Sequence, residues 1–312
     1  EDVRAISRSS PAAARIGSDV LLAAYEGMEG SGLSSDAEAA IIETAAWVRA
    51  GDGDPTAVAL AVRAFRDWPH HWRTVEALHH AVQVASACGC YAVADELCRY
   101  ADHVLASPFV VAPGLELAVE KATYQLFTHQ QRSGTLRRRL RDGGGSRDLR
   151  EAREQNEAAY RASERVYELI GAGLPGVAAG RWEYFLNVRR AEIELIGAQR
   201  VPTETSGRLR ALRQHLADTA EIGVRESFRP QEFVPLIKAE LAKALLEGDV
   251  DAAVHHLGSL HDVGWPLTRT LPEIVAIAEP TRRRERAPAR LRAAVDEIAA
   301  EERDQTMPDR AS

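Results

Sequence analysis

The chain lacks any apolar run of the roughly 18 to 20 residues that a membrane-spanning helix needs. Its first residues also lack the basic stretch followed by an apolar segment that marks a secretory signal. We therefore expect a cytoplasmic protein without a membrane partner. The chain begins at Glu1 and not at Met, which leaves open that it is a piece of a longer protein.

Cysteine is scarce, because only Cys88, Cys90 and Cys98 occur in 312 residues. Three closely spaced cysteines do not form a disulfide framework for a chain of this size. A single Cys-x-Cys pair without a matching second pair is also not typical of a structural zinc site. We interpret the three side chains as reduced and partly buried.

Lysine is nearly absent, so arginine supplies almost all of the positive charge. We attribute this bias, together with the abundance of alanine, to genomic base composition, and we expect a bacterial protein. The formal net charge of −7 argues against a general nucleic-acid binder, because phosphate binding needs a positive field over the contact face. Arginine is nevertheless concentrated at 132–153 and at 282–292.

Signatures of common active sites are missing as well. Gly143–Gly145 lacks the preceding strand and the Gly-Lys-Ser/Thr ending of a phosphate-binding loop. Neither Gly-x-Ser-x-Gly nor His-Glu-x-x-His occurs. The sequence favours a protein that is not an enzyme, and it leaves the question open because helical enzymes can assemble sites from scattered residues.

What the chain does contain is helical periodicity. Apolar residues recur at three- and four-residue steps over 36–303, and no segment shows the strict alternation of a half-exposed strand. This pattern predicts an all-α protein of about eleven helices, with short linkers that make neighbouring helices antiparallel. We expect N-terminal helical hairpins over 1–133, a flexible Arg/Gly-rich loop over 134–147, C-terminal helical hairpins over 148–303 and a tail over 304–312.

A glycine turn followed by a helix with small and apolar residues on one face occurs three times. The three segments are Gly89 with Ala94, Leu97, Cys98, Ala101 and Pro108; Gly248 with Ala253, Leu257, Leu260 and Pro266; and Gly53 with Val58, Phe65 and Pro69. Gly53 and Gly89 are 89 − 53 = 36 positions apart. The segments resemble the second half of a tetratricopeptide repeat, whose period is about 34 residues. The resemblance implies an α-solenoid of stacked antiparallel helix hairpins, an architecture used by interaction scaffolds and by sensor domains of regulators.

We therefore predict a scaffold that binds a protein or peptide segment and needs no cofactor, as the sensing or interaction domain of a larger bacterial regulatory system. Aromatic, amide and guanidinium side chains are suited to hold an extended peptide and its carboxylates. The candidates for such a groove are Tyr160, Tyr167, Trp182, Phe185, Asn187 and Arg189. A homodimer is left open.

Two other functions are kept as alternatives. Glu76 and His79 lie one helical turn apart, as in helical-bundle metal sites, and with His80 and His103 they would bind a transition metal in an all-α enzyme or metal-binding protein. The second alternative is binding of nucleic acid or of an acidic partner segment through arginines. These anion-binding candidates are Arg137, Arg138, Arg139 and Arg141.

Overall fold

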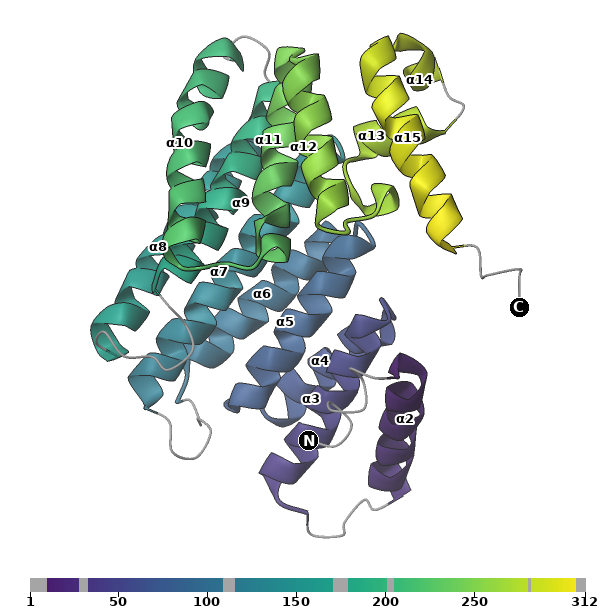
Figure 1. The fold of residues 1–312 in the computed structure, drawn as a ribbon. Coiled ribbons are helices and arrows are strands. Elements are labelled where there is room, and N and C mark those ends of the chain that lie inside the picture. Colours follow the sequence, from purple (N-terminus) through teal and green to yellow (C-terminus); the bar gives the residue numbers. More distant parts are fainter. Residues whose placement is uncertain are drawn as a thin grey trace, which may run out of the picture. The chain divides into compact units, whose positions relative to one another are not determined.

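The computed structural model describes residues 10–27, 33–108, 116–170, 179–200, 205–279 and 282–306. Within these ranges it contains fourteen α-helices, two short 3-10 helices and no β-strand, which confirms the predicted all-α class (Figure 1). No helix in the described ranges has both the length and the apolar character that crossing a membrane requires. The chain divides into two compact units, Glu1–Pro175 and Gly176–Ser312, and each is described by itself.

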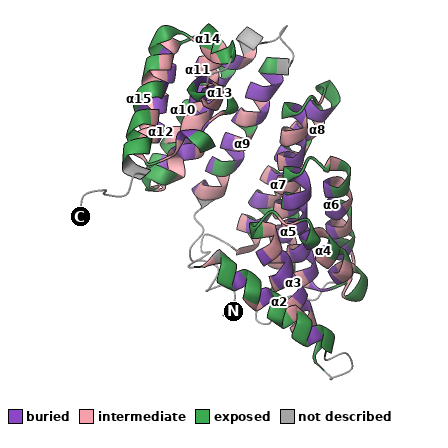
Figure 2. Ribbon diagram, turned by 90° about the vertical axis from the view of Figure 1, so that its right-hand side faces the viewer, coloured by how far each residue is buried: buried purple, intermediate pink, exposed green. Residues whose placement is uncertain are grey.

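The first unit is a succession of helices in which each packs against the next, and α5 also contacts α3 and α7. Its helices are α2 (Pro11–Gly27), α3 (Ser35–Gly51), α4 (Thr56–Asp67), α5 (Trp72–Ala87), α6 (Tyr91–Ala106), α7 (Leu117–Arg141) and α8 (Ser146–Ile170). Ile42, Leu78 and Leu97 are almost completely buried in its core. Buried residues follow α3, α5 and α7, whereas α2 carries exposed residues along much of its length (Figure 2).

Some of the helices begin after a residue whose side chain satisfies one of their first backbone N–H groups. The side chain of Ser34 accepts a hydrogen bond from the N–H of Ala37 at the start of α3. In the second unit, Asp249 accepts one from the N–H of Ala252 at 3.0 Å. A cap of this kind contributes about 1 kcal/mol, so short polar residues at these positions define where the helices start.

The predicted flexible loop over 134–147 is wrong for most of its length. Residues 134–141 continue α7, and α8 begins at Ser146 after a tight turn. Leu136 and Leu140 are buried, and arginine is a good helix former that is favoured near a helix C-terminus. These gains outweigh the roughly 1 kcal/mol that a glycine such as Gly134 costs inside a helix. The boundary between the compact units accordingly lies at Pro175 and not within 134–147.

Helix α2 precedes the region in which periodicity predicts helices. Its inner side buries Ala14, Ser18 and Tyr25, while Ile16 and Val20 are exposed. Because apolar residues occur on both sides, the helix has no single apolar stripe that would reveal it. The predicted tail also needs correction, since α15 extends to Thr306; residues 307–312 lie outside the described part of the chain.

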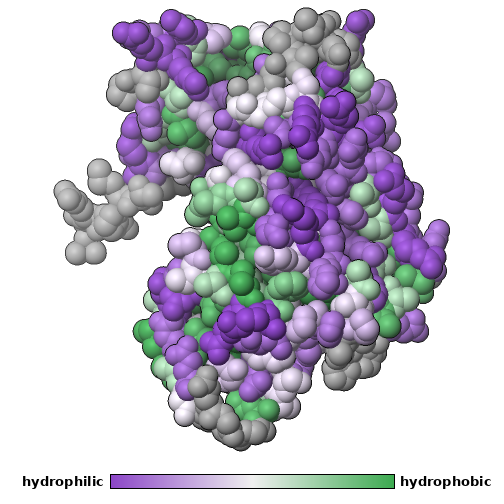
Figure 3. All heavy atoms as spheres, turned by 180° about the vertical axis from the view of Figure 1, so that it is seen from behind, coloured by the Kyte–Doolittle hydropathy of each residue, from purple (hydrophilic) through white to green (hydrophobic). Residues whose placement is uncertain are grey.

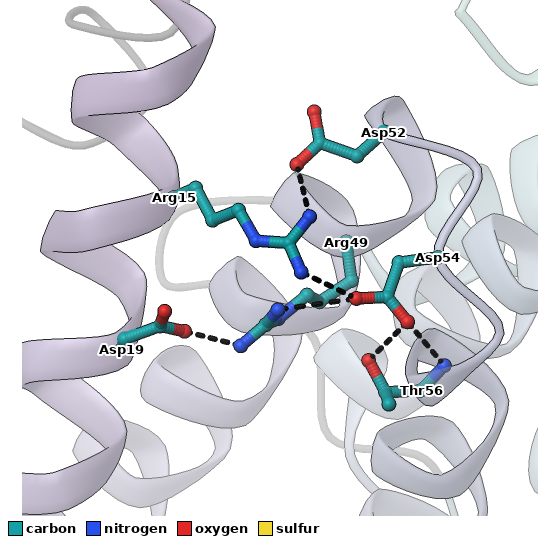
Figure 4. A network of polar contacts seen from close by, with 6 residues as sticks. All are labelled: Arg15, Asp19, Arg49, Asp52, Asp54 and Thr56. Atoms are coloured by element: carbon teal, nitrogen blue, oxygen red, sulfur yellow. Dashed lines mark hydrogen bonds and ion pairs between the residues drawn. The ribbon is translucent and has the colours of Figure 1, made fainter.

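A network of ionic contacts joins α2 to the turn between α3 and α4 (Figure 4). Arg15 contacts Asp52 at 3.4 Å and Asp54 at 3.1 Å. Arg49 pairs with Asp19 of α2 and, at 3.1 Å, with Asp54. Asp54 also accepts hydrogen bonds from the backbone N–H and the hydroxyl of the first residue of α4, at 2.9 and 2.8 Å. Asp54 is therefore the centre of this contact.

The second unit is built around α9, which packs against α10 and α11, while α12 packs against α11 and α15. Its elements are α9 (Ala179–Arg200), α10 (Thr205–Arg225), η2 (Pro230–Phe233), α11 (Val234–Glu247), α12 (Val250–Asp262), η3 (Leu267–Arg269), α13 (Pro272–Ala278), α14 (Arg282–Arg286) and α15 (Ala289–Thr306). Tyr184, Leu212 and Leu216 belong to one apolar cluster, and Leu257 and Val295 belong to another. Hydrophilic side chains cover most of the face shown in Figure 3, in keeping with a charged fraction of 27%.

Candidate binding site

The second unit carries a surface hollow of about 780 Å³ where α10 ends and η2 begins. The side chains that line it are all polar or charged: Arg181, Glu226, Ser227, Arg229, Gln231 and Glu232. Arg181 comes from the first turn of α9, and the other five belong to the connection from α10 through η2. The volume falls in the range of about 300 to 1,000 Å³ that is usual for ligand pockets. We call it the α9–η2 hollow.

A cluster of aromatic rings adjoins this hollow. The ring of the fully buried Tyr184 meets Phe185, Phe228 and Phe233 edge to face, with centroids 5.4, 4.8 and 6.1 Å away. The guanidinium of Arg181, which lines the hollow, lies 5.0 Å from the centroid of Phe228. Phe185 stacks against Phe228 at 6.2 Å and remains 37% exposed. The exposed ring of Phe185 is thus linked through Phe228 to Arg181 of the polar lining.

Tyr184 also fixes the position of η2. Its hydroxyl donates a hydrogen bond to the carbonyl oxygen of Glu232 at 3.2 Å. Burial, with a smaller contribution from Glu240, raises the pKa of Tyr184 well above its usual range. The hydroxyl consequently stays protonated at neutral pH and remains a donor there.

Two glycines allow the elements around the hollow to approach closely. A Cβ added at Gly223 of α10 would lie 2.7 Å from Cε1 of Phe233, and one added at Gly180 of α9 would overlap the side chain of Glu226. Because real Cβ contacts do not come so near, neither position accepts a side chain without displacement of its neighbours. The aromatic cluster depends on Gly223, whereas at Gly180 the group displaced would be the flexible end of Glu226.

Most charges of the lining are matched within the site. Glu232 pairs with Arg181 through Oε1, and its Oε2 accepts the backbone N–H of Arg229 at 2.9 Å. Glu226 lies 3.4 Å from the Nε of Arg225. Arg229 is exposed, and its guanidinium forms no ion pair with any residue that the structure describes. Its positive charge is therefore exposed at the hollow, where the carboxylates of Glu226 and Glu232 are engaged by other groups.

Ser227 occupies a turn position that glycine holds elsewhere in this chain. Its N–H bonds to the carbonyl of Val224, and the N–H of Phe228 bonds to that of Gly223, which closes α10 as a Schellman motif. The same pair of hydrogen bonds closes five other helices, with a positive-φ glycine at the equivalent position: Gly53, Gly89, Gly143, Gly248 and Gly264. Ser227 has φ +55° and is the single non-glycine residue with positive φ among the described residues. That conformation costs a residue with a Cβ about 1 to 2 kcal/mol.

The peptide-groove candidates are divided between the two units. Tyr160 and Tyr167 lie on α8 of the first unit, whereas the remaining four lie on α9 of the second. None of those four is among the residues that line the hollow, and Phe185 is linked to it through Phe228, whose ring lies against Arg181. Asn187 is buried, and Arg189 lies 3.5 Å from Glu192 on its own helix. Phe185 is thus the candidate whose ring contacts the aromatic cluster next to the hollow.

The anion-binding candidates lie in the last turns of α7, not on a loop. Arg139 pairs with Asp148 of α8 at 3.1 Å, and Arg138 donates to the carbonyl of Gln83 of α5 at 3.3 Å. Burial and the adjacent Arg137 lower the pKa of Arg138 below its ordinary value. Arg138 and Arg139, two of the four candidates, thus connect α7 to α5 and α8.

The metal candidates have separate partners. The buried His79 holds its Nε2 2.8 Å from the hydroxyl of Thr128, and burial lowers the pKa of His79 to about 3. Glu76 accepts a hydrogen bond from Tyr124 at 3.3 Å. His80 lies 3.5 Å from Glu43, and His103 meets the ring of Phe65 edge to face at 5.8 Å. In the described ranges, no group of three or more His, Cys, Asp or Glu side chains is arranged to hold a metal ion.

None of the residues that line the hollow was among the candidates selected from the sequence. Arg229 is followed by Pro230, a step that is typical of a helix boundary and does not by itself indicate a binding residue. Ser227 is one indication of an unusual position, because glycine commonly follows a helix at a turn of this kind and serine stands there instead. Comparison of the chain with protein-family models, with curated proteins and with solved structures gives no match.

Proposed function

We propose that the protein is a helical scaffold that binds an extended peptide at the α9–η2 hollow, and that the peptide carries a carboxylate next to an apolar side chain. The observation that carries this proposal is the exposed guanidinium of Arg229 in the hollow, which forms no ion pair with a described residue. Arg181 of the same lining lies 5.0 Å from the ring of Phe228, on which the exposed Phe185 stacks. Its role as the sensing or interaction part of a larger bacterial regulatory system, without a cofactor, stays a prediction from the sequence.

The arrangement of the first unit supports a scaffold of stacked hairpins. Helices α3 and α7 both contact α5, in addition to the contacts between consecutive helices. Contacts between alternate helices are typical of stacked helical repeats, in which each hairpin packs on the next. The glycine turns after α3 and α5 occur at the spacing that resembles the tetratricopeptide period.

The chemistry of the hollow favours a carboxylate as the central group of the ligand. A guanidinium binds a carboxylate through two parallel hydrogen bonds, and a charge-assisted hydrogen bond contributes about 1.5 to 3 kcal/mol. Ser227 and Gln231 add a hydroxyl and an amide that can bond to a peptide backbone. Phe185 and Phe228 supply an apolar surface for the neighbouring side chain.

The test is selection of ligands from a random peptide library on the purified protein, with counter-selection on an Arg229→Ala/Phe185→Ala variant. Fluorescence polarisation then measures the affinity of labelled peptides from the enriched pool. We expect peptides with Asp, Glu or a free C-terminus beside an apolar residue. Arg229→Ala should weaken their binding about 10- to 100-fold, the equivalent of the charge-assisted hydrogen bond.

Arg190→Ala is the matched control, because Arg190 is exposed on the same helix α9 but does not line the hollow. It should leave the affinity unchanged. Enriched peptides that bind wild type and Arg229→Ala equally well would contradict the proposal, as would a selection in which wild type enriches nothing over the double variant.

Variants at Ser227 separate its strain from its hydroxyl. Ser227→Gly should relieve the strain and raise the melting temperature, and it should weaken peptide binding because the hydroxyl is gone. Ser227→Ala should weaken binding to a similar extent without the gain in stability. Unchanged affinity in both variants would remove Ser227 from the contact surface.

A further inference from the structure

Two of the three cysteines lie in a tight turn that the proposed binding site does not use. Cys88 and Cys90 flank Gly89 between α5 and α6, and both are exposed, whereas Cys98 of α6 is buried. Cysteine is among the residue types most often found buried. Two exposed thiols one residue apart therefore depart from its usual environment.

The backbone of the turn brings the two residues within reach of a disulfide. Gly89 has φ +74°, in the left-handed helical region. In helical geometry, with a radius of about 2.3 Å and a rise of about 1.5 Å per residue, Cα atoms two residues apart are separated by about 5.4 Å, and the mirror-image helix has the same spacing. Disulfides span Cα separations of roughly 4.4 to 6.8 Å.

The side chains also leave the turn on the same side. In a right-handed helix, residues two apart point in nearly opposite directions. Here ψ is 2° at Cys88 and φ is −81° at Cys90, and the left-handed conformation of the intervening Gly89 makes the two Cα–Cβ bonds nearly parallel. In agreement with this, the Sγ of Cys90 lies 3.9 Å from the carbonyl oxygen of Cys88.

We propose that Cys88 and Cys90 form a reversible disulfide by exchange with a low-molecular-weight disulfide such as oxidised glutathione. One cysteine thiolate attacks the glutathione disulfide, forms a mixed disulfide and releases one glutathione thiolate. The second cysteine thiolate attacks the cysteine sulfur of that mixed disulfide and releases the other. In total, the two protein thiols lose two protons and two electrons, and oxidised glutathione is reduced to two glutathione molecules.

The surroundings of the turn are compatible with this exchange. A Cβ placed on Gly89 would have no atom within 4 Å, so no other part of the described chain covers the turn at this position. A disulfide closed within three residues forms a small ring, and exposed or strained disulfides are the labile ones. We therefore expect an excess of reduced glutathione to reverse the reaction.

Cys98 provides an internal reference. Burial raises the pKa of its thiol to about 12, so it stays protonated and does not act as a nucleophile. One tryptic peptide, 74–99, contains all three cysteines, because no Lys or Arg occurs between Arg73 and Arg99. Mass spectrometry of this peptide counts every thiol at once.

The experiment incubates the folded chain with oxidised glutathione, denatures it in N-ethylmaleimide and analyses the peptide. Wild type and Cys98→Ala should each lose two alkylatable thiols and carry no glutathione. Cys88→Ser and Cys90→Ser cannot complete the second step, so each should accumulate a stable glutathione adduct on its remaining turn cysteine. Circular dichroism of the variants checks that they are folded.

Either of two outcomes would overturn the proposal. Stable glutathione adducts on wild type would mean that the turn cannot close the disulfide. Three alkylatable thiols in wild type and no adduct in the single variants would mean that these cysteines do not react with a small disulfide at all.

Discussion

Two residues hold unfavourable conformations or environments that their neighbours maintain. Ser227 adopts a left-handed conformation at the hollow, and His79 is buried without charge in the first unit. Strained positions of this kind tend to occur at functional sites, which is why Ser227 supports the proposed binding site. His79 is different, because its hydrogen bond to Thr128 gives it a structural role between α5 and α7.

His79 leads to a prediction about pH. Its pKa in the folded protein is about 3, whereas the unfolded chain takes up the proton near pH 6.5. The stability that depends on neutral His79 is therefore complete above about pH 6.5 and is lost as the pH falls towards 3. Between pH 7 and pH 5, wild type should lose about 2 kcal/mol more unfolding free energy than His79→Gln.

Urea unfolding followed by circular dichroism at the two pH values measures this difference. Other titrating groups, such as His71 and His256, are present in both proteins, so their contributions cancel in the comparison. Equal losses in wild type and variant would show that His79 takes up its proton in the folded state near the ordinary pH.

At the scale of elements, ionic contacts add to a small buried face in holding α2. Few of its side chains are buried, and Asp54 connects Arg15 of α2 with Arg49 of α3. Hydrogen bonding from the backbone of Thr56, assisted by Arg49, keeps the pKa of Asp54 below its ordinary value. The contribution of Asp54 is therefore present above its ordinary pKa and is lost as the pH falls below it.

We predict that Asp54→Asn loosens α2 without unfolding the rest of the first unit. Exposed ion pairs contribute up to about 1 kcal/mol, so amide hydrogen exchange in α2 should accelerate by about five-fold. Exchange measured by mass spectrometry should stay unchanged in α5. The control is Asp102→Asn, which breaks the ion pair with Arg132 between α6 and α7. Uniform acceleration along the unit, or none in α2, would contradict this account.

At the scale of the whole molecule, each unit has its own apolar core. The first is built from α2 to α6 and part of α7, and the second from two clusters between α9 and α15. Units of 175 and 312 − 175 = 137 residues are within the usual size of independent domains, about 50 to 250 residues.

We therefore expect fragments 1–175 and 176–312, expressed separately, to fold by themselves. Each should show a helical circular dichroism spectrum and a cooperative thermal transition. The fragment 176–312 should also retain peptide binding, since it contains the whole α9–η2 hollow. A fragment that is helical but melts without cooperativity would show that its core is incomplete.

The sequence alone determined the helical class, because the three- and four-residue periodicity of apolar residues is a local property. It can be recognised without knowing which helices pack together. The arginine-rich end of α7 shows the limit of such reasoning. Gly134 and its arginine neighbours are typical of a loop. The segment is helical because packing against other helices buries Leu136 and Leu140.

The binding site was decided by the tertiary structure. Phe185 could be selected from the sequence because the few aromatic residues of the chain include a cluster on this helix. Arg181 and Arg229 are 229 − 181 = 48 positions apart and line one hollow together. They meet because Gly223 and Gly180 let α9, α10 and η2 pack closely around Tyr184. Local patterns specify helices, whereas a site assembled from their ends depends on long-range packing that no single segment encodes.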